Sequence, residues 1–148
     1  MKVSKSNLLL AAVLMAAISV QAQQVPQKGD NIILIETAQQ PAEAFKAVMR
    51  KLAVDGVSVA QSNNEILTIE TKWLPVGKLD LSIRYFLFVE DAGGKSIIRI
   101  RGEFTSPSLG ASRVEFRGMN GSMFMRSWEK SIEFANGLGM GETNYLKG

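Results

Sequence analysis

The sequence contains no cysteine and no histidine in its 148 residues. Without cysteine the chain forms no disulfide and has no thiol for the lipid attachment that anchors bacterial lipoproteins. Without either residue it lacks the Ser-His and Cys-His pairs of common hydrolases and the usual ligands of zinc and iron. Carboxylates are the strong metal ligands that remain, and no Asp-rich loop groups them. We therefore expect no bound metal, no cofactor and no enzymatic activity.

The chain also has little net charge. Its formal charge is +3, and two of the lysines that produce it lie within the first five residues. The arginines of the C-terminal half alternate with glutamates and form no basic run. A mixed surface of this kind does not attract polyanions, so no nucleic-acid partner is predicted.

Residues 1–22 have the pattern of a cleaved export signal. Two lysines precede an apolar run from Leu8 to Val20, and the small residues Val20 and Ala22 stand where a signal peptidase reads the chain. The run is too short to span a bilayer as a helix. We expect export to the periplasm or beyond, cleavage after Ala22, a flexible leader over residues 23–30, and no transmembrane anchor.

A hairpin over Leu79–Phe104 is the strongest structural signal. Apolar side chains recur at every second position in both halves, and Gly93-Gly94 suits a two-residue turn with positive φ. Pairing Ala92 with Lys95 brings the two apolar faces together. The preferred register sets Val89 opposite Ile98, Leu87 opposite Ile100, Tyr85 opposite Gly102 and Ile83 opposite Phe104.

A four-residue hairpin loop keeps the same faces but ranks second. It pairs Glu90 with Lys95 and sets Arg84 against Arg101, two like charges. The preferred register instead predicts an ion pair and two cation–π contacts on the reverse face. The pairs are Arg84 with Glu103, Phe86 with Arg101 and Phe88 with Arg99.

The other segments predict two helices and several shorter strands. Pro41 and Glu43 open a helix that closes before Gly56, and Ser122 caps a second helix that ends at a left-handed Gly137. Strands are expected over Asn31–Thr37, Val57–Ala60 and Ile66–Trp73, with Trp73 on the core side, and a short edge strand over Arg113–Arg117.

These elements predict a single α+β domain over residues 31–137. We expect an antiparallel sheet of about four to six strands with two helices packed on one face, in the order strand-helix-strand-strand-strand-strand-helix. Residues 138–148 are polar and rich in glycine, so they are expected to form a frayed C-terminal tail.

The sheet face away from the helices is one candidate site. There Phe86 and Phe88 form an apolar centre, and Arg99 and Arg101 form a cationic rim beside it. This arrangement suits a protein partner or self-association. The alternative is that the segment between the hairpin and the second helix folds over the pair and buries Phe116 against it.

An apolar pocket between the sheet and the C-terminal helix is the second candidate site. Its lining would be Trp73, Tyr85, Phe104 and Trp128, brought together if the sheet curves around the helix. Such a pocket would take a small lipid-like ligand.

The order of elements, with Phe45-Lys46-Ala47-Val48-Met49-Arg50-Lys51-Leu52 leading into Gly56-Val57, resembles the repeated domains of BamC. BamC is a lipoprotein of outer-membrane assembly, and its domains have a TBP-like, helix-grip shape. The resemblance covers residues 31–137 and implies a non-catalytic binding or assembly module of the cell envelope. This chain lacks the cysteine that carries the lipid of such lipoproteins.

Overall fold

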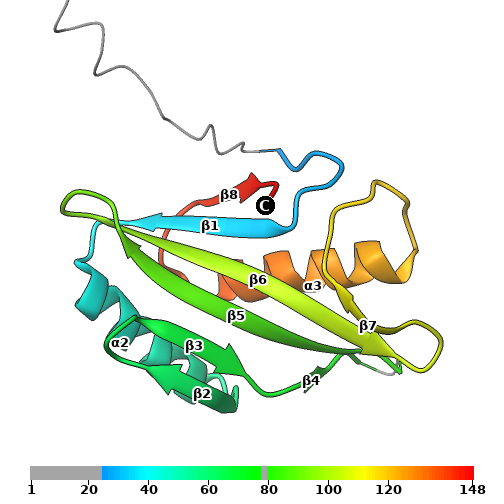
Figure 1. Ribbon diagram of the computed structural model, residues 1–148, viewed down its shortest axis with the longest axis horizontal. Helices are drawn as coiled ribbons and strands as arrows, with labels where there is room; N and C mark the ends of the chain where they lie inside the picture. The colour runs from blue at the N-terminus through cyan, green and yellow to red at the C-terminus, as the bar shows by residue number, and fades with distance from the viewer. Residues whose placement is uncertain (1–24, 78–79) are drawn as a thin grey trace, which may run out of the picture.

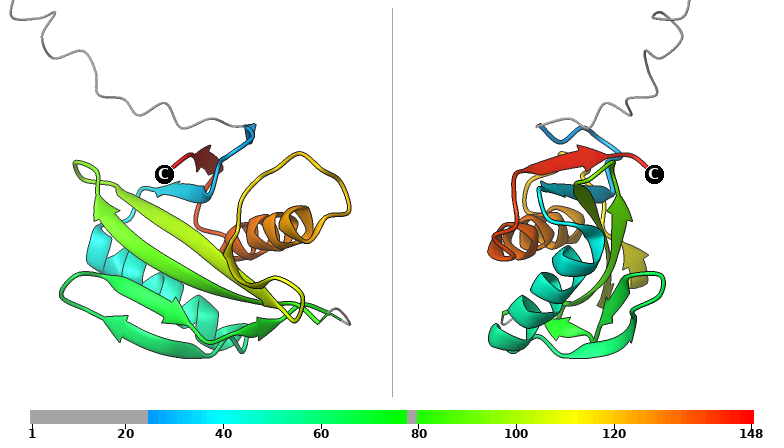
Figure 2. Two further views of the ribbon diagram at one scale, coloured as in Figure 1. Left: turned by 45° about the vertical axis from the view of Figure 1, so that its right-hand side comes forward. Right: turned by 90° about the vertical axis from the view of Figure 1, so that its left-hand side faces the viewer.

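The computed structural model describes residues 25–77 and 80–148, which form an α+β fold with an open antiparallel sheet (Figure 1). The predicted signal peptide lies outside the described residues. The two helices cover the same face of the sheet, as the side view in Figure 2 shows. In chain order the elements are β1 (Ile32–Thr37), α2 (Pro41–Val54), β2 (Val59–Asn63), β3 (Thr68–Thr71), β4 (Leu74–Pro75), β5 (Ser82–Asp91), β6 (Ser96–Ser106), β7 (Gly110–Arg113), α3 (Met123–Gly137) and β8 (Thr143–Leu146).

The sheet has eight strands in the described residues, more than the four to six expected. Its main path is β2-β3-β5-β6-β1-β8, with β4 paired to β5 and β7 paired to β6. The three strands that the sequence did not predict at their positions, β4, β7 and β8, are only two to four residues long. Strands this short carry too little alternation to be recognised from their own sequence.

The register of the central hairpin confirms the preferred prediction. Every expected pair between β5 and β6 is present, including Tyr85 opposite Gly102 and Arg84 opposite Glu103. The Ala92 N–H donates to the Lys95 carbonyl at 2.9 Å. The turn glycines have φ of 71° and 91°, a conformation in which a side chain would be strained. The four-residue loop is therefore excluded.

The two helices lie where their capping signals place them. Pro41 opens α2, and the Ser122 hydroxyl accepts a hydrogen bond from the Met125 N–H at 3.2 Å to cap α3. The predicted left-handed cap at Gly137 is wrong. Gly137 is the last helical residue, and the positive φ, 64°, occurs at Gly139.

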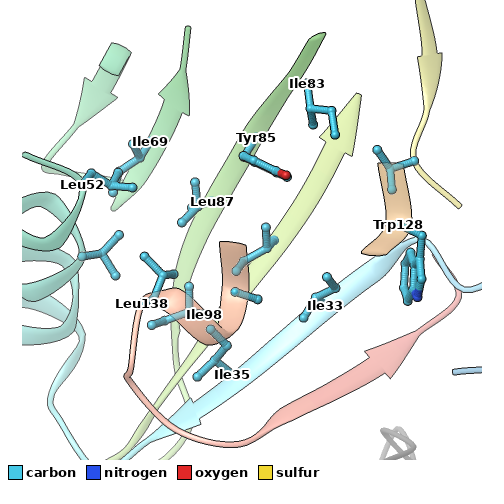
Figure 3. Packing of buried hydrophobic residues seen from close by; sticks show 14 of the residues in the cluster. Ile33, Ile35, Leu52, Ile69, Ile83, Tyr85, Leu87, Ile98, Trp128 and Leu138 are labelled. Carbon is cyan, nitrogen blue, oxygen red and sulfur yellow. The ribbon is translucent and has the colours of Figure 1, made fainter. Parts of the chain in front are cut away.

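The core lies between the helices and the face of the sheet that they cover (Figure 3). Each long strand contributes alternate residues, and Tyr85 stacks on Phe134 of α3 with ring centres 4.0 Å apart. Trp128 is only 1% exposed. The core residues labelled in Figure 3 are Ile33, Ile35, Leu52, Ile69, Ile83, Tyr85, Leu87, Ile98, Trp128 and Leu138.

The segment 138–148 is not the frayed tail that its composition suggests. Leu138 is buried, and Thr143–Leu146 forms β8, which pairs with β1 at the edge of the sheet. Tyr145 packs on Trp128, with ring centres 5.6 Å apart. The Asn31 side chain binds both the N–H and the carbonyl of Gly148, at 3.1 and 3.2 Å. The pairing with β1, the packing of Tyr145 and the two hydrogen bonds of the Asn31 side chain thus order this segment.

The segment after β6 turns toward the helices. Pairing with β6 covers Gly110–Arg113 instead of the predicted Arg113–Arg117. Val114 is buried, and Phe116 packs on Trp128 with ring centres 6.0 Å apart. The Phe116 N–H and carbonyl bond to the end of the expected leader, at Asp30 and Gly29, so that end is ordered. This segment therefore adds to the helix side of the sheet.

Candidate functional site

The outer face of the sheet, opposite the helices, carries the side chains that alternate with the core residues of β5 and β6. On β5, Phe86 and Phe88 point away from the core, while Leu87 between them is only 1% exposed. Phe116 lies on the helix side and does not cover the two phenylalanines. Phe88 is 37% exposed.

These phenylalanines form the floor of an open groove of about 510 Å³ on the outer face. Its walls come from β2 and β3 on one side and from β6 on the other. All four residues predicted for the interface line it. The full lining is Gln61, Thr68, Ile69, Glu70, Phe86, Leu87, Phe88, Glu90, Arg99 and Arg101.

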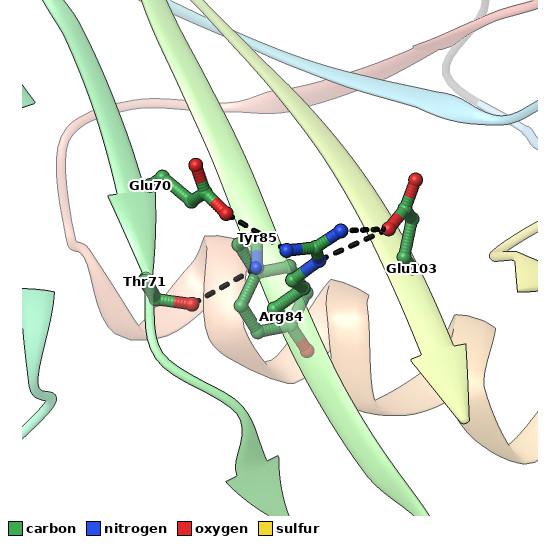
Figure 4. A network of polar contacts seen from close by, with 5 residues as sticks. All are labelled: Glu70, Thr71, Arg84, Tyr85 and Glu103. Atoms are coloured by element: carbon green, nitrogen blue, oxygen red, sulfur yellow. Dashed lines mark hydrogen bonds and ion pairs between the residues drawn. The ribbon is translucent and has the colours of Figure 1, made fainter. Parts of the chain in front are cut away.

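Arg84 binds two glutamates at one end of the outer face (Figure 4). Its Nη1 donates to Glu70 Oε1 at 2.9 Å, and its Nε and Nη2 donate to Glu103 Oε2 at 3.0 and 2.8 Å. The predicted ion pair with Glu103 is therefore confirmed. The guanidinium carbon lies 4.9 Å from the Phe86 ring centre and 4.8 Å from that of Trp73. Arg84 takes the cation–π contact with Phe86 that was expected of Arg101.

Arg99 and Arg101, the two arginines that line the groove, differ in whether they form an ion pair. Arg99 pairs with Glu90 through two hydrogen bonds, Nε to Oε1 at 3.0 Å and Nη2 to Oε2 at 3.1 Å, so its expected stacking on Phe88 gives way to a bidentate ion pair. Arg101 is exposed and forms no ion pair with any of the residues that the structure describes.

The four residues of the predicted apolar pocket are not brought together. Tyr85, Phe104 and Trp128 are at most 3% exposed and belong to the packed core. Trp73 is 40% exposed and lies against Arg84, whose neighbours are on the outer face. Its strand ends at Thr71, so the alternation that predicted a core position for Trp73 stops before reaching it.

Tyr85 is a buried titratable residue with a clearly shifted pKa. Burial raises the pKa of Tyr85 to about 12; the nearby Ser131 hydroxyl lowers it in part, and the Glu133 charge raises it further. The phenol is therefore neutral at ordinary pH, and it points into the core. Over residues 25–77 and 80–148, no three acidic side chains gather as a metal site would require. No helix in the same ranges is long and apolar enough to cross a membrane.

The sequence predicts the floor and the cationic side of the groove but not its opposite wall. Gln61 and Thr68 belong to β2 and β3, whose register with the hairpin the sequence does not specify. Glu70 lies opposite Phe86 across the strands, which brings it within reach of Arg84. The alternation of Glu70 with the buried Ile69 and Thr71 was the one signal that placed it on this face.

Comparisons of the sequence with known proteins identify no relative. No family model matches the chain, and no curated protein matches it. Among solved structures, the chain is similar to a DUF4468 family protein from Bacteroides ovatus, with 13% identity and a TM-score of 0.43. That match covers 80% of this chain and 92% of the other.

Proposed function

We propose that the protein is a non-catalytic binding module that docks a protein partner in the groove on the outer face of its sheet. The observation that carries this proposal is the placement of Phe86 and Phe88 on the groove floor, with Phe116 on the opposite side of the sheet. The element order, which resembles that of envelope assembly domains, agrees with such a role.

The groove has the composition of a protein-binding surface. Its centre is aromatic, and the charged and amide side chains Gln61, Glu90 and Arg99 form a polar rim. Phe88 is 37% exposed, so covering the rest of its ring contributes up to about 1 kcal/mol. A partner that covers both rings therefore has a modest local anchor.

A ligand held between the sheet and α3 is less well supported. The three aromatic side chains expected to line that pocket pack against their neighbours, with Tyr85 stacked on Phe134 and Phe104 edge-on to Phe124. A lipid-like ligand would have to displace these contacts.

Selection from a library of random phage-displayed peptides tests the proposal. Clones enriched on the wild-type protein are expected to lose binding to the Phe86→Ser/Phe88→Ser variant, because the apolar floor is gone. The matched control is Val54→Ser/Leu109→Ser, which removes two exposed apolar side chains that do not line the groove. Enriched clones that bind all three proteins equally, or no enrichment at all, would contradict a binding role for the groove.

We propose further that the protein acts after export, in the periplasm or outside the cell. The support is the signal pattern of residues 1–22. Intact-mass measurement of the protein recovered from its native host is expected to give a chain that begins within a few residues of Gln23. A chain that retains its first residues would refute export by cleavage.

A further inference from the structure

Three arginines line or border the groove, and two of them are neutralised within the chain. Arg84 lies between Glu70 and Glu103, with both carboxylates within 3.0 Å of its nitrogens. Arg99 is held by Glu90 through a bidentate pair. Each of these three glutamates therefore already has an arginine partner, and Glu70 and Glu103 share one of them.

Arg101 is the exception. It lines the groove, is exposed, and forms no ion pair with the described part of the chain. Its cross-strand neighbours are Phe86 on one side and Ile32 on the other. An exposed guanidinium without a carboxylate partner can bind a planar anion such as a carboxylate through two parallel hydrogen bonds. The groove therefore presents one unsatisfied positive charge beside an aromatic floor.

The wall opposite Arg101 is polar, and its one carboxylate, Glu70, is already held by Arg84. Gln61 and Thr68 line it, and both side chains can donate and accept hydrogen bonds. A peptide backbone needs such partners when it loses water, whereas the hydrocarbon tail of a fatty acid has no use for them. The open groove with one polar wall thus favours an extended peptide over a simple amphiphile.

Building on the proposed function, we infer that the groove selects a peptide segment in which an apolar side chain lies two residues from a carboxylate. The apolar side chain packs on Phe86 and Phe88, and the carboxylate binds Arg101. Side chains two residues apart in an extended peptide point to the same face about 7 Å apart. Arg101 lies directly across the strands from Phe86, with Cβ atoms typically about 5 Å apart, so one peptide face reaches both.

Three capped synthetic peptides that differ at one position test this inference on the full-length mature protein. Each has a Leu followed two residues later by Asp, Asn or Lys in a Ser/Thr background, and calorimetry measures the dissociation constant. An exposed ion pair gives the Asp peptide about five-fold tighter binding than the Asn peptide, with the Lys peptide weakest. The preference is expected to shrink as salt rises.

Two arginine variants locate the effect. Arg101→Gln is expected to bind the Asp and Asn peptides equally while keeping the wild-type melting temperature, because its side chain is exposed. The control Arg126→Gln removes the same charge from an exposed position on α3 and is expected to keep the preference. Arg101→Glu is expected to reverse it in favour of the Lys peptide.

The results that would overturn this inference alone differ from those that would also overturn the proposed function. Peptides that depend on Phe86 and Phe88 but show no Asp preference, or an Asp preference that survives Arg101→Gln, would overturn this inference and leave the proposed function standing. Saturable binding of dodecanoate that depends on Arg101, with none of the three peptides binding, would overturn both and assign the groove to an amphiphile.

Discussion

Val114 lies directly against Gly102. The Val114 N–H donates to the Gly102 carbonyl at 2.9 Å, and a Cβ added to Gly102 would come within 2.8 Å of Val114 Cγ2. This close approach holds the chain after β7 against the helix side of the sheet, which is why Phe116 reaches Trp128 and the outer groove stays open.

Gly102→Ala is expected to destabilise the protein by about 1 to 3 kcal/mol, because the new methyl group overlaps the Val114 side chain. Chemical denaturation measures the change. Gly137→Ala is the matched control: its Cβ meets nothing within 4 Å, so helix propensity predicts a gain of up to about 1 kcal/mol. Equal effects of the two variants would show that the Val114 contact is not tight in solution.

Adjacent positions of β5 are expected to differ in their cost of truncation. Leu87→Ala opens a cavity in the core and should cost about 2 to 5 kcal/mol, since Leu87 is 1% exposed. Phe88→Ala removes a ring that is 37% exposed and should cost about 1 kcal/mol or less. Thermal unfolding measures both. A loss at Phe88 as large as that at Leu87 would mean that the outer face is covered in the free protein.

Arg84→Gln is expected to lower stability by about 1 kcal/mol, because two carboxylates and two aromatic rings lose their shared cation. Unfolding in low and high salt should show a smaller loss at high salt, where ion pairs are screened. Glu43→Gln breaks an exposed helix pair with Lys46 and should change stability by a few tenths of a kcal/mol at most. A larger effect at Glu43 would contradict this ranking.

Stability is expected to fall between pH 10 and pH 12, in part because of Tyr85. The folded state keeps its phenol protonated up to a pKa of about 12, while the unfolded chain loses the proton near 10. The stabilisation from this group is therefore fully present below pH 10 and is lost as the pH approaches 12. Two pKa units correspond to roughly 2 to 3 kcal/mol. Denaturation across this range should fall less steeply for Tyr85→Phe, and parallel curves would refute the assignment.

The hairpin could be predicted in detail because local rules agree there. The alternation in both strands, the paired glycines and the Arg84–Glu103 pair all select one register, and the structure has it. Both helices were predictable for the same reason, since Pro41 and Ser122 are capping residues next to apolar residues at helical spacing.

The elements that escaped prediction depend on distant partners. β8 is a strand because β1 lies beside it and Trp128 receives Tyr145, and neither fact is written in residues 143–146. Part of the groove could be predicted from the sequence. Its floor follows from alternation along β5, whereas the unpaired state of Arg101 depends on which glutamates the other arginines reach.

The position of β1 in the sheet governs when the protein can fold. Its two neighbours are β6 and β8, and Asn31 beside it binds Gly148, a residue 117 positions away. During synthesis the apolar run Ile32–Ile35 leaves the ribosome long before either flanking strand exists, and contacts so distant in sequence form slowly. The nascent chain therefore stays open until β6 and β8 have been made. Until then Ile32–Ile35 is an apolar run without its neighbouring strands, which favours aggregation or chaperone binding.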